Sequence, residues 1–180
     1  MGFNLRNLII MLSLGTLILL SYYLFIFYPS ININKWWFGL NKNKLFMRIF
    51  YLTASLAAIG FVYYMYYLCF YLDESQFPNK SDYNDASDKL LIETSIVLVA
   101  SLLWAPLTYG YLKTNYNIYK VLSSIVLGVT GFASVAISYF IYDMTPDSIE
   151  RTLAIIGVSL FSFHTIFIDF GVWNKGMWKL

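Results

Sequence analysis

Five stretches of the chain are long and apolar enough to cross a lipid bilayer, and this feature decides the fold class. A spanning helix needs about 20 mostly apolar residues, and a charge inside it costs about 2.5–3.5 kcal/mol on insertion scales. Stretches that meet this test lie at residues 8–28, 46–72, 90–112, 118–142 and 149–173. The sequence therefore predicts an all-α fold, an integral membrane bundle of five transmembrane helices forming one domain over residues 1–180.

The composition supports a membrane protein and excludes several other classes. Only 12% of the 180 residues are charged, against about 25% in soluble domains, and 59% are hydrophobic. A formal net charge of +2 gives no basic surface for nucleic acid. Cys69 and His164 are the only cysteine and the only histidine, so neither a disulfide framework nor a metal site built on these residue types is expected.

The basic residues are sorted unevenly between the two sides that five spans create. One side carries Arg6, Lys80, Lys89 and Arg151, and the other carries Lys35, Lys42, Lys44, Arg48, Lys113, Lys120, Lys175 and Lys179. Because an excess of Lys and Arg marks the cytoplasmic face, we expect a cytoplasmic C-terminus and a lumenal or extracellular N-terminus. The eight acidic residues in the loops or at the span ends all fall on the side opposite the basic excess.

The hydrophilic loop after the second span contains the tripeptide Asn79-Lys80-Ser81. This pattern is an N-glycosylation acceptor, and in an asparagine-rich chain it also arises by chance.

Glu93, His164 and Asp169 lie at least three residues inside the predicted spans, where burial without a partner is expensive. Glu93 is one turn inside the third span, which suits an interfacial residue that reaches headgroup water. His164 is deep in the fifth span and either bonds to a neighbouring helix or contacts a ligand. Asp169 lies five residues further on, which in an α-helix is an offset of about 140°, so we expect no direct His164–Asp169 pair.

The third span carries a proline in an aromatic setting, Trp104-Ala105-Pro106-Leu107-Thr108-Tyr109-Gly110. Proline removes the hydrogen bond to the carbonyl of Leu102 and is expected to kink the helix. Such a break persists in a membrane where protein or cavity water satisfies the backbone. We therefore expect Trp104, Pro106 and Tyr109 to border a space between helices, and an ordinary packing kink is the alternative.

The fourth span carries small residues at helical spacing, namely Ser124, Gly128 and Gly131. Small side chains let two helix backbones approach closely. This stripe is predicted to be a helix-packing surface, either within the chain or between the protomers of a homodimer.

Taken together, these segments resemble the translocator protein family, also called the tryptophan-rich sensory proteins. The family's third helix carries a Trp-x-Pro-apolar-x-aromatic-Gly run, which residues 104–110 reproduce, and its fifth helix ends in Asn-x-x-Val-Trp, to which 169–173 is similar. Trp36-Trp37-Phe38-Gly39-Leu40 stands where the family keeps a tryptophan-rich lid. The resemblance covers mainly the C-terminal half and implies five helices with a cytoplasmic C-terminus.

The chain also departs from the family pattern at several positions. Ser101 and Asp169 stand where the family has asparagines, and the Pro-x-Trp-x-Pro-Pro pattern before the second helix is missing. No tyrosine follows Tyr142, so the sterol-binding pattern at the end of the fifth helix is missing too.

We expect a protein that binds or transports a hydrophobic small molecule, a sterol or tetrapyrrole, between its helices, with the bilayer as its surroundings and no cofactor required. The ligand-binding residues expected are Ser101, Trp104, Pro106, Tyr109, His164, Asp169 and Trp173. No catalytic residues stand out. The alternatives are a small membrane enzyme acting on a lipid or sterol, with Glu93 or Asp169 beside His164 as acid and base, and a structural assembly protein.

Overall fold

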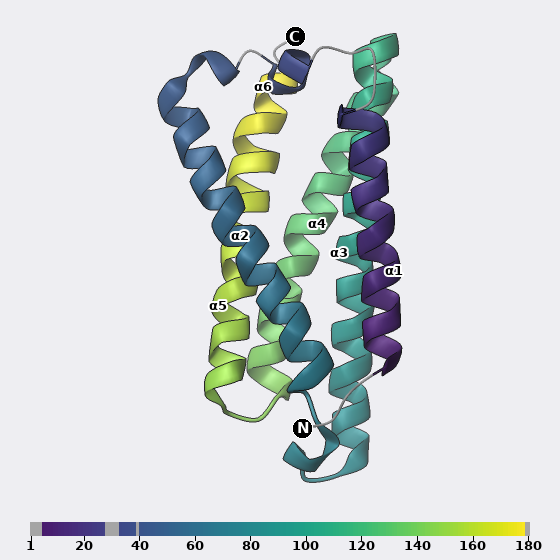
Figure 1. The fold of residues 1–180 in the computed structure, drawn as a ribbon, viewed down its shortest axis with the longest axis vertical. Coiled ribbons are helices and arrows are strands. Elements are labelled where there is room, and N and C mark those ends of the chain that lie inside the picture. Colours follow the sequence, from purple (N-terminus) through teal and green to yellow (C-terminus); the bar gives the residue numbers. More distant parts are fainter. Residues whose placement is uncertain (1–4, 28–32, 39, 179–180) are drawn as a thin grey trace.

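Five helical rods run side by side along the long axis of the molecule (Figure 1). The computed structural model describes residues 5–27, 33–38 and 40–178. Three positions used above, Tyr28, Gly39 and Lys179, lie outside the described residues, and so does the side chain of Arg6. The rods are α1 (Leu5–Tyr22) with the π-helical turn η1 (Tyr23–Phe27), α2 (Lys44–Phe70), α3 (Lys80–Thr114), α4 (Asn117–Met144), and α5 (Ile149–Phe163) continued by the π-helix η5 (His164–Trp173) and α6 (Asn174–Trp178).

Four of these rods are long and apolar enough to cross a membrane. They are Lys44–Phe70, Lys80–Thr114, Asn117–Met144 and Ile149–Trp178, with mean hydropathies of 1.8–2.0. The first rod has a shorter apolar stretch, Met11–Ile26. Outward-facing side chains are apolar as well: Leu19, Ile59 and Phe132 are 67–72% exposed. Length and surface together favour an integral membrane protein in contact with lipid.

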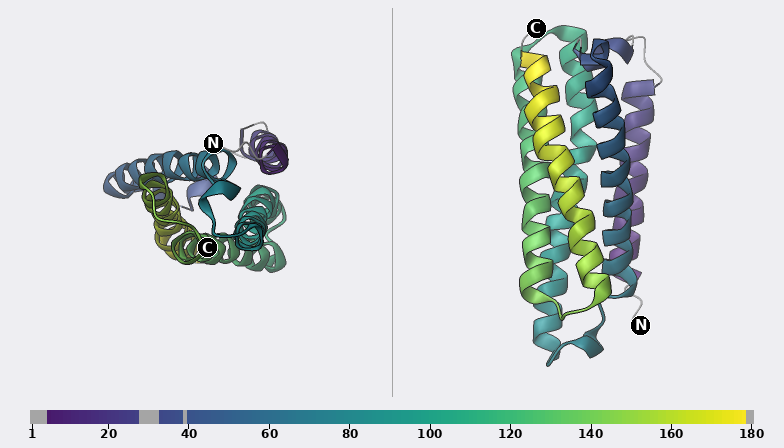
Figure 2. Two further views of the ribbon diagram at one scale, coloured as in Figure 1. Left: turned by 90° about the horizontal axis from the view of Figure 1, so that it is seen from below. Right: turned by 90° about the vertical axis from the view of Figure 1, so that its left-hand side faces the viewer.

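The rods form a ring when the bundle is viewed from one end (Figure 2, left). Going around it, α1 packs on α3, α3 on α4, α4 on α5 and α5 on α2, while α2 touches α1 over a short stretch only. The C-terminus and the 3₁₀ turns η2 (Ile33–Trp37) and η3 (Leu40–Lys42) lie at one end, at the top of Figure 1. We call this the C-terminal end, and the end with the turn η4 (Glu74–Gln76) the opposite end.

Helix α3 begins ten residues before the predicted span of residues 90–112, at Lys80. The Asn79 carboxamide caps it, accepting from the backbone N–H of Asp82 and donating to the Asp82 carboxylate, both at 2.9 Å. A Lys89–Asp85 pair at 2.9 Å supports the same polar turns. The hydrophilic loop is therefore largely helical, and the amide predicted as a glycan acceptor serves as a helix cap.

A buried arginine holds the turn between α4 and α5 at the opposite end. The Arg151 Nε–H donates to the carbonyl of Ile141 (3.2 Å), and its terminal nitrogens bond to the Tyr142 carbonyl and to Asp147. Both carbonyls belong to the last turn of α4, where helix ends leave acceptors to be satisfied from outside the helix, and the Ile141 carbonyl also accepts from the Thr145 backbone N–H and hydroxyl. The guanidinium thus closes the end of one helix while it anchors the start of the next.

Helices α2 and α5 touch backbone to backbone at Gly60 and Gly157. A Cβ placed at Gly60 would lie 2.5 Å from the Gly157 carbonyl oxygen and 2.7 Å from its Cα, and a Cβ at Gly157 would clash with the Gly60 carbonyl in the same way. Only residues without a side chain allow this approach. In Figure 1, α2 crosses α5 and then leans away from the bundle towards the C-terminal end.

Packing differs above and below this crossing. Towards the opposite end, the ring is filled by a core that includes Tyr64, Leu68, Val97 and Ile137, each at most 1% exposed. The Tyr64 hydroxyl is bonded to Thr94 Oγ1 at 2.6 Å, so this buried polar group has a partner. Towards the C-terminal end, a smaller cluster of Phe38, Tyr111, Leu127, Trp173 and Met177 closes the bundle.

The glycine contact yields a stability prediction. Gly60→Ala should lower the thermal unfolding midpoint in detergent, because the new methyl meets backbone that cannot move aside, and overpacking of this kind costs about 1–3 kcal/mol. Gly15→Ala is the matched control, since a Cβ there meets nothing within 4 Å; it should be neutral or gain up to about 1 kcal/mol of helix propensity. Equal midpoints for the two variants would contradict the close crossing.

Candidate functional site

A cavity of about 460 Å³ lies between the crossing and the C-terminal cluster. Ligand pockets commonly have volumes of about 300–1,000 Å³. The residues that line it come from all five rods and from η2: Tyr22, Ile26, Trp36, Trp37, Phe50, Tyr51, Ser101, Trp104, Leu127, Thr130, Phe161, His164, Thr165, Asp169 and Trp173. The cavity is thus an apolar, strongly aromatic chamber with a few polar side chains on its wall.

Tryptophans make up much of the wall. Four of the five tryptophans in the chain line the cavity. Trp104 is central, with its ring centroid 5.3 Å from that of Trp173 and 5.8 Å from that of Trp36. Tyr22 of α1 adds an edge contact to Trp104 at 5.6 Å. Aromatic walls in these tilted geometries bind flat, apolar molecules by stacking and edge contacts.

The segment η2–η3 forms a lid over the C-terminal end of the cavity. The indole N–H of Trp173 donates to the backbone carbonyl of Trp36 at 2.8 Å, across 137 residues of sequence. Phe38 adopts a left-handed backbone conformation (φ 47°), and its ring packs against Trp173 at 5.1 Å. The tryptophan that ends η5 therefore fixes the lid to the fifth rod.

Two indole N–H groups in this cluster have no hydrogen-bond partner. They are the Nε1 groups of Trp36 and Trp104, both buried. A buried donor without an acceptor costs about 1–3 kcal/mol. A ligand that carries an acceptor oxygen gains a hydrogen bond if either ring turns its N–H towards the cavity.

One corner of the cavity is polar, and His164 organises it. The Thr53 hydroxyl of α2 donates to the Ile49 carbonyl (2.9 Å) and lies 2.9 Å from His164 Nδ1. Because the Thr53 hydroxyl donates its proton to the Ile49 carbonyl, its oxygen can accept from His164 Nδ1–H. In this tautomer of the neutral imidazole, Nε2 is a hydrogen-bond acceptor. The Phe50 ring, 5.1 Å from the imidazole, fixes its orientation from α2.

His164 Nε2 lies 3.5 Å from Asp169 Oδ1, so the expectation that these two side chains cannot pair is wrong. The reason is the local helix type. Residues His164–Trp173 form a π-helix, in which hydrogen bonds join residues five apart and bring positions i and i+5 onto one face. The expected offset of about 140° holds for an α-helix, and nothing in the residue pattern indicates a π-helix here.

Proline 106 occupies a different position from the one expected. It does not line the cavity, and α3 continues as one helix through it. The Leu102 carbonyl, which lacks its usual donor because Pro106 has no N–H, accepts a hydrogen bond from the Ser21 hydroxyl of α1 at 3.1 Å. The carbonyl that Pro106 leaves free thus serves to attach α1, and the cavity lies where α2 diverges from the bundle.

The structure brings together five of the seven predicted ligand-binding residues. Ser101, Trp104, His164, Asp169 and Trp173 line the same cavity. Tyr109 does not line it. Its ring centroid lies 5.6 Å from that of Phe25, and the Lys113 ammonium lies over the ring, 5.8 Å from the centroid. Glu93 also lies away from it.

The small-residue stripe of α4 packs inside the chain. A Cβ at Gly131 would lie 2.6 Å from the Ile166 side chain, and one at Gly128 would lie 3.4 Å from the Phe170 ring. The Ser124 hydroxyl donates to Asn174 Oδ1 (2.7 Å) and accepts from the Trp178 indole N–H (3.0 Å). Since η5 and α6 cover it, this stripe is not available for contact between protomers.

Sequence reasoning missed the contribution of α1 and α2 to the site. The site includes Tyr22, Phe50, Tyr51 and Thr53. In the sequence, these are ordinary aromatic or small polar residues of apolar segments. Thr53 offered a weak signal, as an isolated hydroxyl residue in the predicted second span.

Comparison of the chain with protein-family models, with curated proteins and with solved structures finds no match. The function is therefore inferred from the cavity itself.

The Ser21–Leu102 bond gives a prediction with an internal control. Ser21→Ala should destabilise the protein by about 1–3 kcal/mol, because it leaves a buried carbonyl without a donor. In a Pro106→Ala background, the restored N–H takes over that carbonyl and the same change should cost much less. Unfolding midpoints of the four proteins in detergent give the coupling energy, and strict additivity would mean that Ser21 does not serve the proline break.

Proposed function

We propose that this protein is a multi-pass membrane protein that binds a flat, hydrophobic small molecule, a tetrapyrrole or a sterol, in the cavity between its helices. The observation that carries the proposal is the chamber of about 460 Å³, with four tryptophans on its wall and a single polar corner. Pockets of this size that are mostly apolar, with a few convergent polar groups, are typical small-molecule sites. The polar corner orients the ligand, and the indoles supply the contact area.

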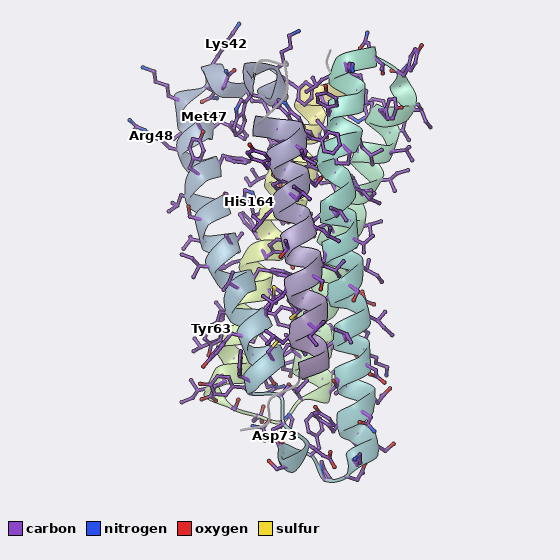
Figure 3. All side chains as sticks on the ribbon, turned by 45° about the vertical axis from the view of Figure 1, so that its right-hand side comes forward. Lys42, Met47, Arg48, Tyr63, Asp73 and His164 are labelled. Atoms are coloured by element: carbon purple, nitrogen blue, oxygen red, sulfur yellow. The ribbon has the colours of Figure 1, made fainter. Side chains whose placement is uncertain are left out.

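The proposal includes a topology of five spans with the C-terminus in the cytoplasm. Its support is the charge distribution: Lys42, Lys44, Arg48 and Lys113 lie at the C-terminal end, while Asp73, Asp82 and Asp143 lie at the opposite end. Figure 3 shows Lys42 and Arg48 reaching outwards at the first end and Asp73 at the other. Lys35, Lys42 and Lys44 are exposed there and attract an anionic ligand group towards that end.

Kinship with the translocator protein family is part of the proposal. The residues that carry the resemblance meet at one place, since Trp36, Trp37, Trp104, Asp169 and Trp173 all line the cavity. A chance likeness of scattered motifs gives no reason for such a convergence. Asp169 stands where the family has an asparagine, so the cavity wall carries an acidic group that the family pattern lacks.

An enzymatic role has one specific observation in its favour, the contact between His164 Nε2 and Asp169 Oδ1 at the cavity wall. An imidazole acceptor beside a carboxyl group is a plausible acid–base pair for isomerising a lipid or sterol. Binding remains the better-supported function because it uses the whole cavity rather than two side chains of it.

Titration with protoporphyrin IX, followed by quenching of tryptophan fluorescence, tests the proposal. Trp104→Ala combined with His164→Ala should weaken binding by about tenfold or more, because it removes a wall and the polar corner. Trp178→Ala is the matched control: it removes a tryptophan that does not line the cavity and should leave the affinity within about threefold. Cholesterol added as a competitor distinguishes the two ligand classes.

Equal affinity in the double variant and the wild type would overturn this pocket as the binding site. Asp169→Asn separates binding from catalysis, because the amide keeps the size and hydrogen-bonding capacity of the carboxyl group and cannot exchange a proton. A binder should keep its affinity within about threefold, whereas an enzyme should lose nearly all turnover of its substrate.

A further inference from the structure

Helices α1 and α2 touch near the opposite end and separate towards the C-terminal end. Their contact is marked by Cys69 of α2, whose thiol donates to Met11 Sδ of α1 at 3.6 Å. Beyond it, α2 leans away from α1 (Figure 1), and the two helices contribute Tyr22, Ile26 and Tyr51 to the cavity wall. In the view of Figure 3, His164 is seen in the gap between the ribbons of α2 and α1, and its Nδ1 lies 2.9 Å from Thr53 of α2. We call the space between these helices beside the cavity the seam.

The cavity wall is exposed beside the seam, at Tyr51, and buried at the lid. Tyr51 lines the cavity and is nevertheless 58% exposed, so the wall at this point also forms the outer surface. At the lid, Trp36, Phe38 and Trp173 are only 4–8% exposed. Opening the lid requires breaking the Trp173–Trp36 hydrogen bond and exposing these rings to water, whereas the seam needs no such change.

The outer surface on both sides of the seam is apolar. Exposed side chains on the two rods that border it include Leu20 of α1, Leu24 of η1 and Leu52 of α2, at 45–63% exposure. In a membrane these side chains face hydrocarbon. The rings of Phe50 and Tyr51 lie 4.9 and 6.2 Å from Trp37, so α2 and the lid together frame the upper edge of the opening.

We propose that the cavity exchanges its ligand sideways with the bilayer, through the seam between α1 and α2, in the leaflet next to the C-terminal end. The ligand class follows from the route: a membrane-dissolved amphiphile whose polar group reaches the His164–Asp169 corner, rather than a water-borne metabolite. This inference rests on the proposed binding function and specifies the source of its ligand.

Locking the lid tests the route. A Cβ at Gly176 lies 3.5 Å from the Phe38 Cβ, at the short end of the range of about 3.5–4.5 Å found in disulfides. Phe38→Cys with Gly176→Cys, in a Cys69→Ser background to prevent mispairing, should therefore form a bond that holds the lid closed. The same protein after reduction is its own control for the loss of the Phe38 ring.

The readout is the rate at which protoporphyrin IX quenches tryptophan fluorescence in phosphatidylcholine proteoliposomes. Exchange through the seam predicts association and dissociation rates within about twofold between the oxidised and reduced protein. Exchange through the lid predicts a drop of about tenfold or more on oxidation, reversed by dithiothreitol, and that result would overturn the inference.

Tyr51→Ala provides an independent test in case the disulfide forms incompletely. Widening the seam should raise the association rate by about threefold or more, and the dissociation rate should rise at least as much because Tyr51 also lines the cavity. Tyr139→Ala on α4 is the matched control, because Tyr139 is also 58% exposed and does not line the cavity. Unchanged rates in Tyr51→Ala, or an equal rise in Tyr139→Ala, would count against the seam.

The two levels of the proposal fail in different ways. If the wild-type protein in vesicles does not bind protoporphyrin IX or cholesterol at all, the binding function is wrong and the route falls with it. If the wild type binds and only the oxidised lid variant exchanges slowly, the function stands and the sideways route is wrong.

Discussion

The contact between Gly60 and Gly157 is the constraint on which the rest of the structure depends. At these two glycines no side chain separates the helices, so their backbones touch. From this contact, α2 runs at an angle to α5. On one side of the crossing, large buried side chains pack together inside the ring. On the other side, α2 lies too far from the other helices for their side chains to fill the space between them, and this space is the cavity.

The polar corner depends on a second backbone feature, the π-helical segment that begins at His164. It turns the imidazole and the Asp169 carboxyl group onto one face and positions Trp173 to bond the lid. π-helical geometry often occurs at functional sites, because an altered helical register re-aims side chains without ending the helix. Aromatic walls, polar corner and lid attachment are thus all connected to the fifth rod.

Much of the fold could be predicted from the sequence, because apolar length is a strong signal and few structures satisfy backbone groups in lipid. The fourth and fifth predicted segments lie within apolar helices that begin close to the expected residues, and the second is shifted by two residues from α2. The polar turns before residue 90 were taken for a loop. The site was only partly accessible. Trp104 and Trp173 stand out as residue types, but Gly60 and Gly157 lie about a hundred residues apart, and a π-helix has no distinctive composition. Pro106 was expected to make room for a ligand, and the Ser21 hydroxyl that occupies its free carbonyl comes from a helix 81 residues away.

An experimental structure of the protein in lipid with protoporphyrin IX, or with cholesterol if that binds better, tests the central claim most directly. The account predicts ligand density between α1, α2 and the fifth rod, against Trp104 and with a polar group within hydrogen-bond distance of His164 or Asp169. A ligand held on the outer surface along α3 and α4, or a cavity filled by protein side chains with Gly60 and Gly157 apart, would contradict it.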